Sequence, residues 1–234
     1  MNVDELKYFV DALANKWKSG AISPDEYNSF LASASMEYFK LKIGIPEEYQ
    51  VGQYQSRQAY QVSQKITDDL RFLIEPPKTL TKNARGFYDL PTDYGAFSSL
   101  SYKYVVNNGC GEPTVEDTLI EVVTDGEYQI RKNNSIIPPT VLYPIAVFYS
   151  NEVLVLPKQI TQPNLTYIRI PKTPIRAYTI QNDDDVYDPA NSVQLEYPET
   201  THYDIAYIIL KMMGLNIRKE EIVAFANQRQ KEGQ

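Results

Sequence analysis

The centre of the chain contains, at residues 145–170, the stretch IAVFYSNEVLVLPKQITQPNLTYIRI. Two runs of apolar, β-branched and aromatic residues, 145–149 and 153–156, flank a short polar segment, and this pattern predicts a β-hairpin. A further strand is expected at 165–170, closed by Pro171. The short links between these runs favour an antiparallel meander over a parallel, helix-connected sheet.

Runs typical of β-strands continue over residues 78–199, which hold most of the 15 prolines and many β-branched and aromatic runs. Between them, residues 127–131 are polar and are expected to form a helical turn or two. Other strand candidates occupy 87–91, 101–106, 119–123, 175–180 and 193–197.

The first 77 residues are expected to be helical. Apolar residues recur at three- and four-residue spacing along a first helix that Gly20 ends. Ser23, Pro24 and Glu26 predict the start of a second helix that runs to about Leu41. A third helix is expected at 55–73, with Pro76-Pro77 ending it. The expected buried positions of the first two helices are Val3, Leu6, Val10, Leu13, Trp17, Tyr27, Phe30, Leu31, Ala34, Tyr38 and Leu41.

Residues 200–234 predict a pair of helices. Thr200 or Thr201 is expected to cap the first, and Gly214 to end it. Its apolar face comprises Ile205, Ile208, Ile209 and Met212, and a last helix is expected at 218–230. The sequence therefore predicts an α+β fold: N-terminal helices (1–77), a central β-meander rich in Pro and Tyr (78–199), and a C-terminal helix pair (200–234) that packs with the N-terminal helices.

Composition excludes several classes of protein. The formal charge of −7 and the lack of Lys/Arg runs argue against broad phosphate binding. A single cysteine, Cys110, excludes an intramolecular disulfide and a cysteine-based metal cluster. We expect no secretory signal and no membrane span, because neither pattern is visible.

The sequence shows none of the residue combinations that nucleophilic catalysis or phosphate binding requires. The only histidine, His202, is expected at a helix start in a neutral capping or surface role. Cys110 is interpreted as a free thiol in a turn, and no nucleophile elbow or phosphate-binding glycine motif occurs. We therefore expect no catalytic residues, no cofactor and no enzymatic activity.

Acidic residues offer one metal candidate, at Asn182-Asp183-Asp184-Asp185. Carboxylates suit Ca²⁺ or Mg²⁺, but the glycine and the distal acid of a calcium loop are absent, so a solvated loop is the preferred interpretation. Asp68 and Asp69 are adjacent on a predicted helix and diverge by about 100°. No metal site is predicted, although cation binding by Asp183–Asp185 stays open.

Tyrosine is unusually frequent, with 19 residues against eight Phe and one Trp. A tyrosine presents a large apolar face and a polar tip, which suits surfaces that bind a partner. Tyrosine also fills strand positions. We expect both uses in this chain.

Several segments together resemble the head–tail connector (ring or adaptor) proteins of tailed bacteriophages, and most closely the ring proteins of crAss-like podoviruses. The middle segment YDLPTDY (88–94) is similar to a strand-and-turn of such connectors, although the small residues at 95–99 depart from the bulkier strand expected there. The other similar segments are 4–10, 22–28, 66–73, 167–174, 204–214 and 220–233.

This resemblance implies a virion structural protein, made in the host bacterial cytoplasm and located at the head–tail junction. It implies a homo-oligomeric, twelvefold ring below the portal, in contact with the portal protein and neighbouring tail rings. Double-stranded DNA would pass through the lumen during genome ejection without specific binding, and net negative charge suits such a conduit. No membrane partner is implied.

Two alternatives stay open. A non-catalytic protein-binding module of another assembly would use the same Tyr-rich surface for a different partner. A metal-dependent hydrolase would need the acidic loop at 182–185 as its site.

Overall fold

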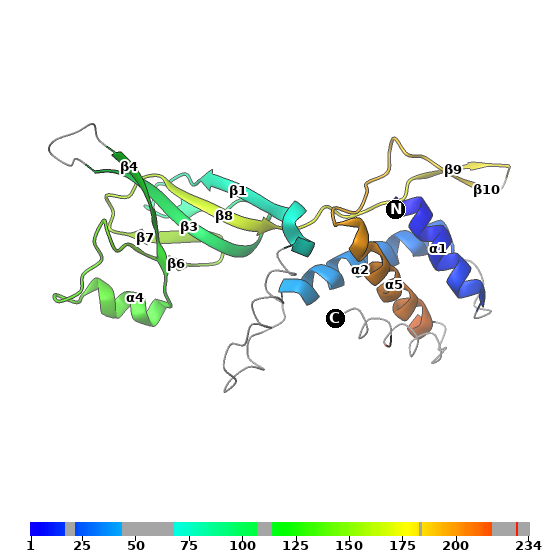
Figure 1. Cartoon of the computed structure of the whole chain (residues 1–234), viewed down its shortest axis with the longest axis horizontal. Coiled ribbons are helices and arrows are strands. Elements are labelled where there is room, and N and C mark those ends of the chain that lie inside the picture. Colours follow the sequence, from blue (N-terminus) through cyan, green and yellow to red (C-terminus); the bar gives the residue numbers. More distant parts are fainter. Residues whose placement is uncertain (17–21, 44–67, 107–113, 183, 217–227, 229–234) are drawn as a thin grey trace. The chain divides into compact units, whose positions relative to one another are not determined.

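The structure is a computed structural model that describes residues 1–16, 22–43, 68–106, 114–182, 184–216 and 228. The chain divides into two compact units (Figure 1). Unit 1 combines Met1–Leu73 with Pro171–Gln234, and unit 2 is Ile74–Ile170. The predicted α+β class is confirmed, with N-terminal helices, antiparallel sheets and a C-terminal helix. Residues 171–199, which the sequence groups with the β-rich region, belong to unit 1.

Unit 1 is built on three described helices: α1 (Val3–Lys16), α2 (Pro24–Ile43) and α5 (His202–Asn216). Ser23 caps α2 as predicted. The Glu26 amide donates to Ser23 Oγ at 3.3 Å, and the Ser23 hydroxyl donates to the Glu26 carboxylate at 3.0 Å. These bonds satisfy a backbone donor that a helix start would otherwise leave without a partner.

Apolar side chains of all three helices form the core of unit 1, and α5 packs against both α1 and α2. Among the predicted core positions Leu13 and Phe30 are only half-buried and Leu41 is exposed. Met212 is half-buried, whereas its neighbour Met213 is buried. Fully or almost fully buried are Val3, Leu6, Val10, Tyr27, Leu31, Ala34, Ile205, Ile208 and Ile209.

The helix α5 differs from its prediction at both ends. It begins through a 3₁₀ turn, η3 (Glu199–Thr201), and the Thr201 hydroxyl donates to the Pro198 carbonyl at 2.8 Å instead of capping the helix. Gly214 lies inside α5 and is buried, so the prediction that it ends the helix is wrong. Packing of the last turn outweighs the roughly 1 kcal/mol by which glycine disfavours helix.

Several predicted features lie outside the described residues. They are Trp17, Gly20, the third helix up to residue 67 and nearly all of the last helix at 218–230. No helix in the described ranges combines the length and apolar character needed to cross a membrane.

Unit 2 contains two four-stranded sheets. The first, sheet A, is antiparallel with the order β1-β8-β3-β4, where β1 is Ile74–Thr79, β8 is Pro163–Arg169, β3 is Tyr94–Val106 and β4 is Thr114–Leu119. Because β8 lies between β1 and β3, this order departs from a simple meander. The small residues at 95–99 lie within β3, which bulges against β8 on both sides of Ala96-Phe97.

The second sheet, sheet B, has the order β2-β7-β6-β5, with β2 at Tyr88–Asp89, β7 at Glu152–Leu156, β6 at Ile145–Phe148 and β5 at Glu121–Val122. The predicted hairpin is confirmed as β6 and β7, paired from Ile145–Leu156 to Phe148–Val153. In contrast to the other pairs, β5 and β6 are parallel. They are joined through α4 (Asp125–Lys132), where the sequence predicts a helical turn or two.

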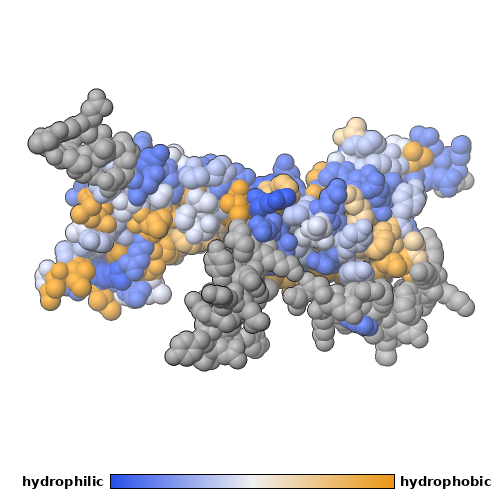
Figure 2. Space-filling view, in the orientation of Figure 1, coloured by the Kyte–Doolittle hydropathy of each residue, from blue (hydrophilic) through white to orange (hydrophobic). Residues whose placement is uncertain are grey.

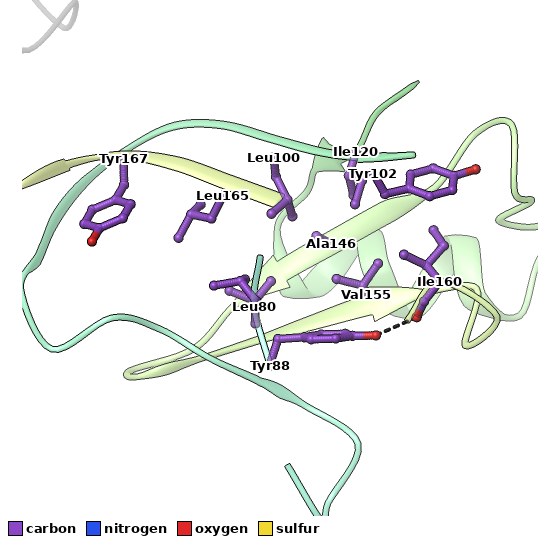
Figure 3. Packing of buried hydrophobic residues seen from close by; sticks show 11 residues of the cluster. Leu80, Tyr88, Leu100, Tyr102, Ile120, Ala146, Val155, Ile160, Leu165 and Tyr167 are labelled. Carbon is purple, nitrogen blue, oxygen red and sulfur yellow. Dashed lines mark hydrogen bonds between the residues drawn. The ribbon is translucent and has the colours of Figure 1, made fainter. Parts of the chain in front are cut away.

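Unit 2 is layered, because alternate residues of sheet B face opposite sides. Ala146, Val153 and Val155 belong to the core between the two sheets, whereas Ile145 and Val147 pack with Tyr128 of α4. Figure 3 shows the inter-sheet core, in which the Tyr88 hydroxyl donates to the Ile160 carbonyl at 2.5 Å. The core of unit 2 is thus completed by its own side chains.

The prolines Pro76 and Pro77 lie inside β1. This differs from their predicted role, which was to end a helix. A proline cannot donate to a neighbouring strand, so it is tolerated only at edges and bulges. Both conditions hold, because β1 is an edge strand and its register with β8 shifts between Glu75 and Lys78.

Unit 1 also carries a two-stranded hairpin of β9 (Tyr178–Gln181) and β10 (Asp184–Tyr187). The predicted strand at 175–180 is thus only partly correct. The predicted strand at 193–197 is wrong, because this segment forms a single bridge, between Val193 and Ile175. Asn182 at the tip has φ 53°, a left-handed conformation that asparagine tolerates.

Candidate interaction surfaces

His202 is buried, with 5% of its surface exposed. Its Nε2 lies 3.1 Å from the Tyr197 carbonyl, so Nε2 carries the proton and donates it to that oxygen. Burial lowers the pKa of His202 below its ordinary value. The predicted place at a helix start is confirmed, because α5 begins at His202, and the expected neutral state is supported. Of the two expected roles, capping or surface, the surface role is wrong because the side chain is buried.

The stability of unit 1 is expected to depend on pH through His202. The unfolded chain takes up a proton near the ordinary pKa of 6.5, whereas the folded chain does so only at lower pH. The free energy of unfolding should therefore fall as the pH drops from about 7.5 to 5.5. Because the chain has one histidine, His202→Gln should flatten this slope in urea unfolding curves. An unchanged slope in the variant would assign it to other groups.

The predicted acidic loop at 182–185 is partly strand, because Asn182 follows β9 whereas Asp184 and Asp185 begin β10. Asp183 lies outside the described residues, Asp184 is exposed, and Asp185 forms an ion pair with Arg176. Adjacent strand residues face opposite sides, so the sequence neighbours Asp184 and Asp185 diverge. In the part of the chain that the structure describes, no group of three His, Cys, Asp or Glu side chains is placed to hold a metal ion.

Arg176 is a buried charged residue of unit 1 that no pattern in the sequence indicates. Its side chain is 2% exposed and contacts two carboxylates, with Nε 2.7 Å from Asp4 and Nη1 2.7 Å from Asp185. The Asn28 side chain bonds both the carbonyl and the amide of Arg176, at 3.0 and 2.8 Å. The guanidinium also lies 5.7 Å from the Tyr187 ring. Arg176 thereby joins α1, α2 and the β9–β10 hairpin, which is a structural role.

The other candidates from the sequence are not brought together. Cys110 lies outside the described residues. Asp69 pairs with Lys42 of α2 at 2.9 Å, an ion pair within unit 1. His202 lies in no group of three or more His, Cys, Asp or Glu side chains that could hold a metal ion, among the residues that the structure describes.

Sheet A has a shallow polar depression of about 420 Å³. Lys103 and Asp117 face each other across β3 and β4, and the Thr79 hydroxyl donates to the Asn164 side chain at 2.8 Å. Its lining comprises Pro77, Thr79, Ser101, Lys103, Asp117, Gln162 and Asn164. These groups form hydrogen bonds, but they include no histidine or cysteine that could serve in nucleophilic catalysis.

An apolar surface, here called the loop patch, covers the end of unit 2 beside α4 (Figure 2). It consists of Leu119, Val122, Ile130, Ile136, Ile137, Val141, Leu142 and Tyr143, all 37–87% exposed. Residues 133–144 contain no charged side chain. At its rim Arg131 and Glu121 pair with each other. Large exposed apolar patches commonly mark binding surfaces.

Two groups of aromatic side chains near the end of β6, together called the aromatic flank, are Tyr94, Phe97 and Phe148 on the side of the inter-sheet core and Phe87 with Tyr149 on the α4 side, where the Tyr149 hydroxyl donates to Asp125 at 3.2 Å. The ring of Phe148 lies 5.2 Å from Phe97 and 6.2 Å from Tyr94, and Phe87 lies 5.9 Å from Tyr149. Phe97 is 40% exposed and Tyr149 42% exposed. Arg85 lies over the Phe87 ring at 5.6 Å.

Tyrosine fills strand positions, as predicted, for example at Tyr88, Tyr102 and Tyr167, whereas its use in binding a partner stays a prediction. Tyr27 and Tyr197 are buried and donate to the Val3 and Ser35 carbonyls at 2.9 and 3.0 Å. Burial raises the pKa of Tyr197 to about 12. In contrast, Tyr143 is 77% exposed and Tyr8 is 66% exposed. The exposed tyrosines are available to a partner.

Comparison of the chain with known protein families and with curated proteins gives no match to either. The function is therefore argued from the residues and surfaces of the chain itself.

Proposed function

We propose that this chain is a virion structural protein, a ring-forming adaptor between the portal and the tail of a tailed bacteriophage. The observation that carries the proposal is the loop patch. Unit 2 completes its core with its own side chains and still exposes eight large apolar residues at one end. An exposed surface of this kind is stabilised when a partner covers it.

The resemblance of the sequence to connector proteins suggests that the assembly is a ring. A ring subunit contacts its two neighbours through different surfaces, and unit 2 offers two, the loop patch and the aromatic flank. Such a role needs shape and contacts and no catalytic group. The net charge of −7 suits a conduit for DNA, because negative charge at the lumen would repel phosphates and keep the genome free to slide.

The proposal is tested by binding to a portal. The purified chain should co-sediment with the portal protein encoded in the same genome, and negative-stain images should show a ring of about twelve subunits on one end of the portal. A portal from an unrelated phage serves as the control. If the chain does not bind its own portal but binds a non-virion protein, this result would favour the alternative, a binding module in another assembly.

A further inference from the structure

We infer that the polar depression on sheet A binds a small zwitterionic α-amino acid, held between the Lys103 ammonium and the Asp117 carboxylate. Such a site uses only side chains of one copy of unit 2, so it would exist whether or not the chain forms a ring. The chemical class of the ligand follows from the way in which these side chains are arranged.

The depression lies on the outer face of sheet A. Residues directly opposite each other in an antiparallel sheet share a face. Three such cross-strand pairs line the depression of about 420 Å³: Thr79–Asn164, Asn164–Ser101 and Lys103–Asp117. The alternate residues Leu100 and Leu165 point instead into the core between the two sheets (Figure 3). The depression is therefore separate from the core, and its volume lies in the range of small-molecule sites.

The two charged side chains of the depression leave each other unpaired. Lys103 and Asp117 are exposed and directly opposite, yet neither forms an ion pair with the other or with any residue in the described ranges. In the same sheet Arg169 of β8 does pair with Glu75 of β1, at 3.1 Å. Two unpaired charges of opposite sign that line one depression complement a ligand that itself carries both charges.

Uncharged polar groups beside the two charges add hydrogen-bonding partners. The Thr79 hydroxyl donates to the side-chain oxygen of Asn164 at 2.8 Å, so the amide N–H groups of Asn164 are left to donate to a ligand. The carboxylate of an α-amino acid would thus meet Lys103 and Asn164. Its ammonium would meet Asp117 and the hydroxyl oxygen of Ser101, which is half-buried.

The same lining disfavours other classes of ligand. An anion such as phosphate would be repelled by Asp117, and a divalent cation would find one carboxylate and be repelled by Lys103. Among the described residues of the lining Pro77 is the only apolar one, and none is aromatic. The side chain of the bound amino acid is therefore small or polar, which makes L-serine a suitable probe.

Binding of L-serine to the full chain is measured by ligand-observed saturation-transfer NMR, which works for a monomer and for a large assembly. Two analogues each lack one charge: L-serinamide has no carboxylate and N-acetyl-L-serine has no ammonium. Serine should bind saturably below about 50 mM at low ionic strength, because salt screens exposed charges. Each analogue should bind about fivefold more weakly, the loss expected for one exposed charge contact.

Two substitutions assign the two contacts. In Lys103→Gln serine and serinamide should bind about equally, because the carboxylate has lost its ammonium partner. In Asp117→Asn serine and N-acetylserine should bind about equally for the corresponding reason. The control Lys132→Gln removes an exposed lysine of α4 that does not line the depression, and it should leave serine binding unchanged. Thermal melts establish that each variant is folded.

Several outcomes would overturn the site. They are the lack of saturable serine binding to the wild type, and serine binding that is unchanged in both Lys103→Gln and Asp117→Asn. If N-acetylserine binds the wild type as tightly as serine, the depression takes an anion only, and equally tight binding of serinamide means a cation only. Either result contradicts a zwitterion site. The portal test is independent of all these results, so failure of this site and failure of the proposed ring are distinguishable.

Discussion

Replacing Arg176 with Met is expected to lower the free energy of unfolding of unit 1 by about 3–5 kcal/mol. The substitution removes a guanidinium that is 2% exposed and leaves the carboxylate of Asp4, itself 17% exposed, without its counter-ion. The ion pair with Asp185 of the β9–β10 hairpin is lost at the same time. Urea unfolding followed by circular dichroism at the helical minimum measures the effect, because the long helices α1, α2 and α5 all belong to unit 1.

Two further variants make this prediction specific. Arg176→Lys keeps the charge but cannot form the planar fork to Asp4 and Asp185, so its stability should lie between the wild type and Arg176→Met. Arg85→Met removes an arginine that is 71% exposed and paired with Glu152, and it should cost less than about 1 kcal/mol. Equal stabilities of Arg85→Met and Arg176→Met would refute the structural role of Arg176.

The substitution Leu165→Ala is expected to destabilise unit 2 by about 2–5 kcal/mol. Leu165 lies on β8, is 0% exposed and packs in the core between the two sheets (Figure 3). Shortening it removes apolar contacts and leaves a cavity that the paired strands cannot readily close. Hydrogen exchange of peptides from β3 and β8 should report the loss as faster exchange.

The matched control is Leu119→Ala, which removes the same atoms from a leucine that is 72% exposed. It should change the stability of the folded chain by less than about 0.5 kcal/mol. If the chain assembles as proposed, Leu119→Ala should instead weaken association. A stability loss as large as that of Leu165→Ala would mean that Leu119 is part of the core.

The parts of the fold that the sequence predicts well are those set by local chemistry. Ser23 and Glu26 identify the start of α2 because they satisfy helix donors within one turn. The β6–β7 hairpin follows from two apolar runs with a short polar link. In each case the residues that determine the structure are neighbours in the sequence.

The parts that the sequence does not predict depend on distant residues. Pro76 and Pro77 are compatible with either the end of a helix or an edge strand, and the choice requires the partner strand β8, some 90 residues later. Gly214 continues α5 because the buried face of the helix extends past it. The order of sheet A likewise results from long-range pairing.

The same distinction applies to the functional surfaces. Composition indicates an excess of tyrosine but cannot say which tyrosines are exposed. The loop patch does have a local signal in the sequence, the twelve consecutive uncharged residues at 133–144, which was not recognised as a surface. Arg176 has no such local signal in the sequence, because only the folded structure brings Asp4 and Asp185 to its side chain.

The mass of the purified chain in solution tests the central claim most directly. Native mass spectrometry of the chain alone should give one discrete closed species of about 320 kDa, corresponding to twelve subunits of 26.8 kDa, or the chain should add about that mass to the portal assembly when the two are mixed. A discrete species with a slightly different subunit number would still be a ring. A single species at 26.8 kDa under both conditions would contradict the account.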